Sequence, residues 1–183
     1  MSERAMRAYA AQKRFHPHTL ERWLGWAEAD RNALAQIALG LKVSENHLRE
    51  MMDWLEEIAL REGSKIHEIL SEKQITDIQT DPRIGRPDKV KRVKEELRRR
   101  RFPRLTAIED AIQEKIRGLK LQPEIRASVP PGLEGGRLVV AFTAGSREEL
   151  KRAAKKLSEA ADSELAAEIF KLLSGAPVEE AAK

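Results

Sequence analysis

The sequence predicts a mainly α-helical protein with a small α+β unit at its C-terminal end: an N-terminal helical bundle, a basic helix, then a helix-strand-strand-helix unit. Three observations lead to this fold class. Apolar residues recur at helical spacing from His18 to Leu70. Basic residues crowd into the segment that follows, and two short alternating segments further along are typical of strands. At 183 residues, the chain can hold one ordinary domain or two small ones.

Residues 1–75 form the predicted N-terminal helical domain. Its apolar positions group into three or four short helices that would bury the three tryptophans. Asp30 and Ser44 are residue types that cap helix N-termini, and Gly63 is typical of a helix C-terminal end. We expect Asp30 to accept hydrogen bonds from the free amides of the second helix, and Ser44 to open the third.

Residues 76–87 are predicted to be a linker, because two prolines and a glycine interrupt any regular period. Pro87 suits the first turn of the next helix, where a missing amide hydrogen is no loss. That helix is expected to run to about Arg101, before Pro103.

Residues 88–175 are predicted to hold the basic helix and the helix-strand-strand-helix unit, and residues 176–183 a flexible tail. Thr106 with Glu109, and Ser146 with Glu149, have the spacing of capping boxes for two helices. Between these helices, the ranges 125–129 and 138–143 alternate as strands do, and the glycine- and proline-rich range 130–136 is typical of a turn.

The basic segment is the strongest functional signal. From Arg83 to Arg104 there are eleven basic and three acidic residues, so this segment carries +8 and the rest of the chain −4. Such a concentration is the electrostatic footprint expected for a polyanion partner, nucleic acid being favoured over an anionic membrane surface. The predicted phosphate contacts are Lys91, Lys94, Arg98, Arg99, Arg100, Arg101 and Arg104.

The packing of this helix decides whether those cations are available. Val90, Val93 and Leu97 make an apolar stripe that should dock onto the protein and leave another face for phosphate. If carboxylates of the N-terminal half pair with the guanidinium groups, the charge argument for nucleic acid fails.

Residues 33–48 have the form of a helix-turn-helix, with a glycine near the turn and a serine at the start of the second helix. In that interpretation Ser44, Asn46, His47 and Arg49 would approach a DNA groove. The second helix carries six acids against two arginines, however, which is unfavourable beside phosphate. The N-terminal block could therefore read bases or contact a protein.

Residue types that carry catalysis and metal binding are sparse. The chain has no cysteine, which excludes disulfides, thiolate metal sites and cysteine nucleophiles. The four histidines lack metal-binding spacing, and a capping or exposed role is expected for His16 and His18. We expect no enzyme activity, no metal and no cofactor. No apolar run approaches a membrane span and the N-terminus lacks a signal peptide, which predicts a cytoplasmic protein without membrane contact.

The C-terminal segments beginning at Leu105, Gly135 and Ser146 resemble the C-terminal dimerisation and DNA-binding domain of ParB-type partition proteins. The resemblance implies a homodimer in which second strands pair and last helices pack together, with surface lysines such as Lys151, Lys155 and Lys156 binding DNA. The family's arginine-rich CTP-binding motif is absent from the chain. The implied dimer seam consists of Val139, Ala141, Leu150, Ala154, Leu157 and Ala161.

Two functions follow as hypotheses. The first is a homodimeric protein that binds double-stranded DNA, in partition or transcription, mostly through phosphate contacts from the basic helix and Lys155. The alternative is a non-enzymatic interaction or assembly protein with charge-complementary halves, in which the acidic N-terminal block docks against a basic surface of the same or another chain.

Overall fold

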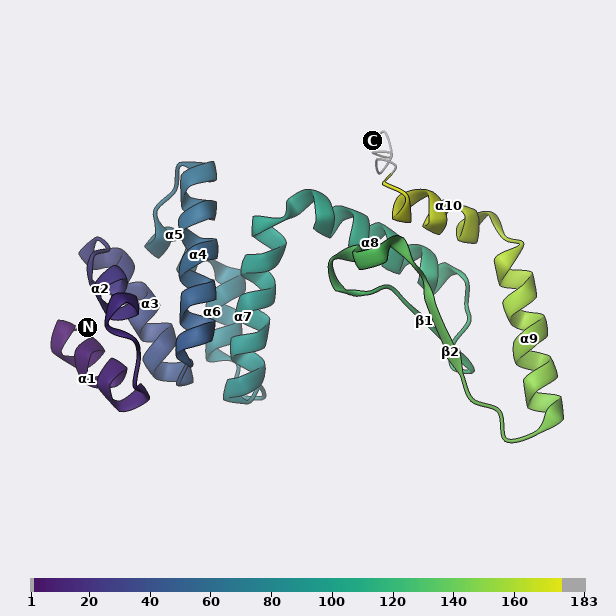
Figure 1. Cartoon of the computed structure of the whole chain (residues 1–183), viewed down its shortest axis with the longest axis horizontal. Coiled ribbons are helices and arrows are strands. Elements are labelled where there is room, and N and C mark those ends of the chain that lie inside the picture. Colours follow the sequence, from purple (N-terminus) through teal and green to yellow (C-terminus); the bar gives the residue numbers. More distant parts are fainter. Residues whose placement is uncertain (1, 176–183) are drawn as a thin grey trace. The chain divides into compact units, whose positions relative to one another are not determined.

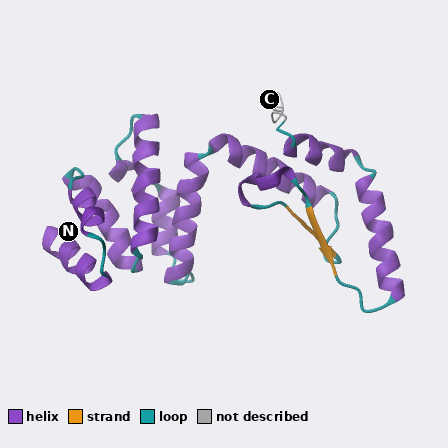
Figure 2. Cartoon of the chain, viewed as in Figure 1, coloured by secondary structure: helices purple, strands orange, loops and turns teal. Residues whose placement is uncertain are grey.

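The computed structural model describes residues 2–175, so the predicted tail at 176–183 lies outside the described residues. The chain is mostly helical with one small antiparallel sheet, which confirms the predicted fold class (Figure 1, Figure 2). It divides into two compact units, unit 1 from Met1 to Phe102 and unit 2 from Pro103 to Lys183.

Unit 1 is entirely helical over the residues described. The long helix α4 packs against α2, α5 and α7, and α7 also contacts α3 and α6. The helices are α1 (Glu3–Lys13), α2 (Pro17–Leu24), α3 (Glu28–Leu41), α4 (Glu45–Glu62), α5 (Ile66–Leu70), α6 (Lys73–Thr80) and α7 (Arg86–Arg101).

Local sequence explains where these helices begin and end. Ser44 occupies the N-cap position of α4, as predicted, but its side chain makes no capping hydrogen bond. Gly63 ends α4 with φ at +64°, a conformation that glycine adopts without strain. Asp30 does not have its predicted role, because α3 already begins at Glu28. Its carboxylate instead accepts from the backbone N–H of His67 at 2.8 Å, and so satisfies an amide in the first turn of α5.

The basic helix belongs to the core of unit 1. Val90, Val93 and Leu97 are buried in the same apolar cluster as Trp23 and Leu55, which confirms the predicted stripe. The predicted linker at 76–87 is replaced in part by α6, whose Ile75 and Ile78 also pack on this cluster. The boundary between the units falls between Phe102 and Pro103 in the chain, so the basic helix lies in the N-terminal unit rather than the C-terminal one.

Unit 2 contains the predicted helix, two strands and helix, followed by one more helix. Ile125 lies opposite Phe142 and Ser128 opposite Val139 in the antiparallel pair of strands. The elements are α8 (Pro103–Gly118), β1 (Ile125–Ser128), the 3-10 helix η1 (Pro131–Gly136), β2 (Val139–Phe142), α9 (Arg147–Ala161) and α10 (Glu164–Leu173).

The helix ends of unit 2 agree with the predicted caps at one position and differ at two. Thr106 is not an N-cap, because α8 already starts at Pro103; the Glu109 carboxylate accepts from the backbone N–H of Gly132 at 3.0 Å. Ser146 does cap α9, accepting from Glu149 N–H. The predicted last helix is two helices, since Ser163 interrupts it and caps α10.

The core of unit 2 lies between α8 and α10. Ile112 and Ile116 of α8 pack with Ile169 and Leu172 of α10. A second cluster joins Ile125 of β1 to α9. The additional helix α10 thus supplies half of the main core.

Candidate functional site

The C-terminal end of α7 is held by carboxylates from α4 and the segment before α6. The guanidinium of Arg100 donates to Glu62 at 2.6 and 2.9 Å and to Glu72 at 2.6 Å. Arg101 donates two hydrogen bonds to Glu57, at 2.6 and 2.7 Å. The Arg100 hydrogen bond is the main cause that lowers the pKa of Glu62, and hydrogen bonding to Glu62 and Glu72 raises the pKa of Arg100.

Arg61 of α4 completes this cluster. Its guanidinium donates to the backbone carbonyls of Arg100 and Arg101, at 2.6 and 2.7 Å, and to Glu62 at 2.7 Å. Three guanidinium groups thus meet the three carboxylates of Glu57, Glu62 and Glu72, and their formal charges cancel. We call these six residues the arginine cluster.

The other predicted phosphate contacts differ in how exposed they are. Arg98 lies 3.6 Å from the Glu95 carboxylate, and Arg99 also interacts with the rest of the chain. Lys91 and Arg104 are exposed. The ammonium group of Lys155 in α9 lies 3.8 Å from Glu159, and its side chain is 80% exposed. Arg104 and Lys155 belong to unit 2, and the other predicted contacts belong to unit 1.

Lys94 is the most enclosed of the predicted contacts. Its ammonium group lies 2.5 Å from Glu50, 3.1 Å from Nδ1 of His47 and 5.8 Å from the centre of the Trp54 ring. Carboxylates of the N-terminal half therefore pair with Lys94, Arg100 and Arg101, so the charge argument for nucleic acid fails at these three residues. These three cations serve the packing of α7 on α4.

A groove of about 870 Å³ opens beside Lys94, between α7 and the α3–α4 turn. Its apolar lining consists of Leu41, Val43, Trp54, Pro87 and Val90. Its charged lining consists of Lys42, Arg86, Lys91, Lys94 and Arg98, with the two carboxylates of Glu50 and Glu95. The groove therefore has an excess of three positive charges when His47, which also lines it, is neutral.

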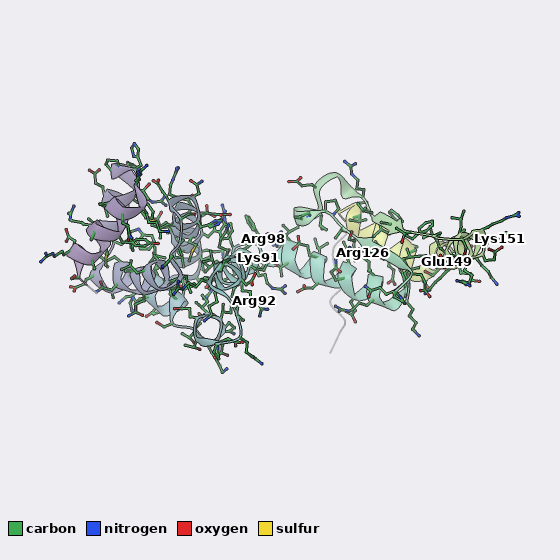
Figure 3. All side chains as sticks on the ribbon, turned by 90° about the horizontal axis from the view of Figure 1, so that it is seen from below. Lys91, Arg92, Arg98, Arg126, Glu149 and Lys151 are labelled. Atoms are coloured by element: carbon green, nitrogen blue, oxygen red, sulfur yellow. The ribbon has the colours of Figure 1, made fainter. Side chains whose placement is uncertain are left out.

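Sequence reasoning missed Lys42, Arg86 and Trp54 as members of one site. Lys91, Lys94 and Arg98 are spaced by three and four positions, which places them on one face of α7, whereas Arg86 lies about 120° around the helix from Arg98 and could not have been added from helical spacing. Lys91 and Arg98 lie on the same side of α7, whereas Arg92 projects from another side (Figure 3). Nothing in the sequence showed that the α3–α4 turn lies against that face.

The predicted helix-turn-helix corresponds to α3, a turn through Val43, and α4. One face of α4 belongs to the core of unit 1, with six of its 18 side chains buried. Its acids are also engaged, since Asp53 and Glu56 each pair with Arg22 at 2.6 Å. Among the residues proposed for a DNA groove, Ser44, Asn46, His47 and Arg49 are exposed at the start of α4. Base contact by these four residues stays a prediction.

The predicted dimer seam in unit 2 is exposed except at one position. Val139 and Leu150 are 45% and 49% exposed, and Ala141, Ala154 and Ala161 are also on the surface. Leu157 differs, because it packs on the cluster of Leu121, Ile125 and Ala153 inside unit 2. Two further large apolar side chains of this unit, Phe142 and Phe170, are 37% and 53% exposed.

Neither a metal centre nor a membrane span is found within residues 2–175. No group of three or more histidines or carboxylates there is placed to hold a metal ion. His16 has the capping role that was expected, because its Nδ1 accepts from the backbone N–H of His18 at 3.2 Å at the start of α2. No helix within the same range is long and apolar enough to cross a bilayer.

Comparison with protein-family models, with curated proteins and with solved structures gave no match.

Proposed function

We propose that this chain is a non-enzymatic interaction protein, in which unit 2 joins two copies of the chain and unit 1 carries the surface that meets a protein partner. The observation that supports this proposal best is the contrast between charge and apolar surface. The cations at the end of α7 are neutralised by carboxylates of their own unit, whereas apolar side chains of β2, α9 and α10 are exposed.

The exposed apolar side chains favour self-association through unit 2. Val139 and Ala141 lie on the face of β2 opposite to Val140, which packs inward. β2 pairs with β1 on one side, so its other edge can accept a strand from a second copy. Leu150 lies on α9, and burying such side chains in a dimer contributes about 25 cal/mol for each Å² of apolar surface.

The mass of the protein in solution tests self-association. Leu150→Lys places a charge in the proposed seam without touching the core, and light scattering should show a shift from dimer to monomer. Leu157→Lys is a poor test, because Leu157 supports the fold of unit 2. Leu60→Lys is the matched control, since Leu60 is 87% exposed on unit 1 and its substitution should leave the mass unchanged. A monomeric wild type, or equal effects of Leu150→Lys and Leu60→Lys, would refute dimerisation through this seam.

Nucleic-acid binding is a second candidate function, favoured by the exposed cations outside the arginine cluster. Lys91 and Arg92 are exposed on α7. Lys151 and Lys155 are exposed on α9, where Lys151 projects away from the rest of unit 2 (Figure 3). Each cation that faces a phosphate releases a counterion, so duplex DNA should bind less tightly as salt increases. Titration of a labelled duplex at two salt concentrations tests this, and the absence of binding at low salt would remove the candidate.

A further inference from the structure

We propose that the groove between α7 and the α3–α4 turn binds an acidic amphipathic helical segment of a partner protein. This inference rests on the partner-binding role proposed for unit 1 and names the chemistry of the partner. It does not depend on self-association through unit 2.

The floor of the groove is apolar and preformed. Val43 and Val90 are 1% and 9% exposed, and Trp54 is 9% exposed, so their side chains are already packed before a partner arrives. Leu41 is half-buried and Pro87 is exposed, so these two supply most of the apolar surface that a partner can still remove from water. A partner that covers it needs apolar side chains of its own, because an apolar surface gains free energy only by removal from water.

Trp54 offers a hydrogen bond that the described part of the chain does not use. The indole N–H groups of Trp23 and Trp26 donate to the Arg31 carbonyl at 3.2 Å and to Glu56 at 2.8 Å. Trp54 has no hydrogen-bond acceptor within residues 2–175; its ring contact is the ammonium group of Lys94. The Trp54 N–H is not one of the buried polar atoms that lack a partner, so it reaches the surface, where a carboxylate or carbonyl of a bound segment can accept from it in place of water.

The rim of the groove selects for negative charge. Lys42, Arg86 and Lys91 form no ion pair within residues 2–175. The carboxylates that share the groove are already engaged, Glu50 with Lys94 at 2.5 Å and Glu95 with Arg98 at 3.6 Å. Acidic side chains of a partner would therefore meet unpaired cations, and such complementarity favours encounter as well as register.

The groove fits a protein segment better than a polyphosphate chain. A phosphate backbone would leave the apolar floor uncovered. The face of Trp54 is also unavailable for base stacking, because the side chain is 9% exposed and Lys94 lies over the ring. A segment that alternates acidic and apolar side chains satisfies both the floor and the rim.

The length of the charged rim indicates a helix of about three turns. Arg86 and Arg98 are separated by twelve positions of α7, which span about 18 Å at the rise of an α-helix. A partner helix of similar length would place leucine-type side chains on the floor at i, i+3, i+4 and i+7, and carboxylates toward the rim.

Fluorescence anisotropy with a defined peptide tests the proposal on the full chain. The probe is a labelled helix-forming peptide of about 16 residues that repeats Leu-Glu-Glu-Leu, and its partner probe has Gln at every Glu position. We expect the acidic peptide to bind and the Gln peptide to bind at least about tenfold more weakly. Binding of both peptides with equal affinity, or of neither, would overturn the proposal.

A matched pair of variants locates the site. Lys91→Glu and Arg92→Glu make the same charge change at adjacent exposed positions of α7, but only Lys91 lines the groove. We expect Lys91→Glu to weaken the acidic peptide about tenfold or more and Arg92→Glu by less than about twofold. Circular dichroism should show that both variants are folded. Equal losses in the two variants would overturn the assignment to the groove.

Two further measurements separate this inference from its alternatives. A duplex DNA of equal charge should not displace the bound peptide, and displacement by DNA would assign the surface to nucleic acid instead. The peptide should also bind the Leu150→Lys variant with unchanged affinity. If peptide binding fails while light scattering still shows a dimer, the inference about the groove is wrong and self-association stands.

Discussion

The guanidinium of Arg100 lies 2.6 Å from the carboxylate of Glu62, a residue 38 positions earlier in the chain. Both side chains are about three-quarters buried, at 25% and 28% exposure. This contact ties the end of the basic helix to α4, and it explains why a run of four arginines can lie inside a folded unit. The acidic excess of the N-terminal block and the basic excess of α7 are complementary parts of one structure.

Loss of this contact should destabilise unit 1. Arg100→Gln removes the charge that faces Glu62 and Glu72, and we expect the free energy of unfolding to fall by about 1 kcal/mol. Urea denaturation followed by circular dichroism measures the change. Arg92→Gln is the control, because Arg92 is exposed on the same helix. Equal stability of the two variants would show that the arginine cluster contributes nothing.

Stability should fall in acid. The pKa of Glu62 is lowered chiefly by hydrogen bonding to Arg100, and that of Glu45 chiefly by the Thr19 hydroxyl, which donates at 2.6 Å. A carboxyl whose pKa is lower in the folded state stabilises the fold above its unfolded pKa, near 4.3, and loses that contribution as the pH falls further. Denaturation midpoints should therefore drop between about pH 5 and pH 3. Glu62→Gln should make this drop shallower, and an unchanged slope would contradict the assignment.

The hydroxyl of Tyr9 should lose its proton at a higher pH than the hydroxyl of an exposed tyrosine. Tyr9 is the one tyrosine of the chain, and its hydroxyl donates to the carbonyl oxygens of Ala38 and Val43 at 3.0 and 2.6 Å. Burial raises the pKa of Tyr9 to about 12. The raised pKa stabilises the fold below about pH 10, and this contribution is lost as the pH rises toward 12. Absorbance at the tyrosinate band should show no transition near pH 10 while the protein is folded, and a transition there would contradict the burial.

Tyr9→Phe tests the same contact at neutral pH. The substitution leaves the two carbonyl groups at the end of α3 without this donor, and we expect a loss of roughly 1–2 kcal/mol. Thermal unfolding measures it. A variant as stable as the wild type would mean that water replaces the hydroxyl.

A core substitution in one unit should destabilise that unit and leave hydrogen exchange in the other unchanged. Leu97→Ala removes a fully buried side chain of α7 and should cost about 2–5 kcal/mol in unit 1. Hydrogen exchange should then increase in α4 and α7 and stay unchanged in α8 and α10. Ile169→Ala should give the reverse pattern, because Ile169 lies in the core of unit 2. Increased exchange in α8 after Leu97→Ala would place the basic helix with the C-terminal unit, which is the grouping that the sequence predicts.

Periodic apolar spacing predicted most of the fold. The stripe of Val90, Val93 and Leu97 was correctly assigned to a docking face, and the strands and the Ser146 cap were correctly located. The expected linker was wrong in part because α6 is short and begins after Glu72 without a strong capping signal. The break before α10 was missed because Asp162 and Ser163 are common on exposed helix surfaces as well as at caps.

The candidate site was harder to predict, because its residues come together only in three dimensions. The count of charges along the chain predicted that Arg98 to Arg101 form an exposed surface for a polyanion. It could not show that Glu57, Glu62 and Glu72 face Arg100 and Arg101. The unpaired charge lies instead toward the start of α7, at Arg86 and Lys91, beside a turn that sequence places more than forty residues away.

The role of the arginine cluster is tested most directly by duplex binding measured at two salt concentrations for the wild type and for an Arg100→Gln, Arg101→Gln double variant. If these arginines hold α7 on α4, the double variant loses stability while its affinity for the duplex and its salt dependence match those of the wild type within about twofold. If instead the double variant keeps its stability and loses salt-dependent duplex binding, the two arginines contact phosphate and do not hold the basic helix on α4.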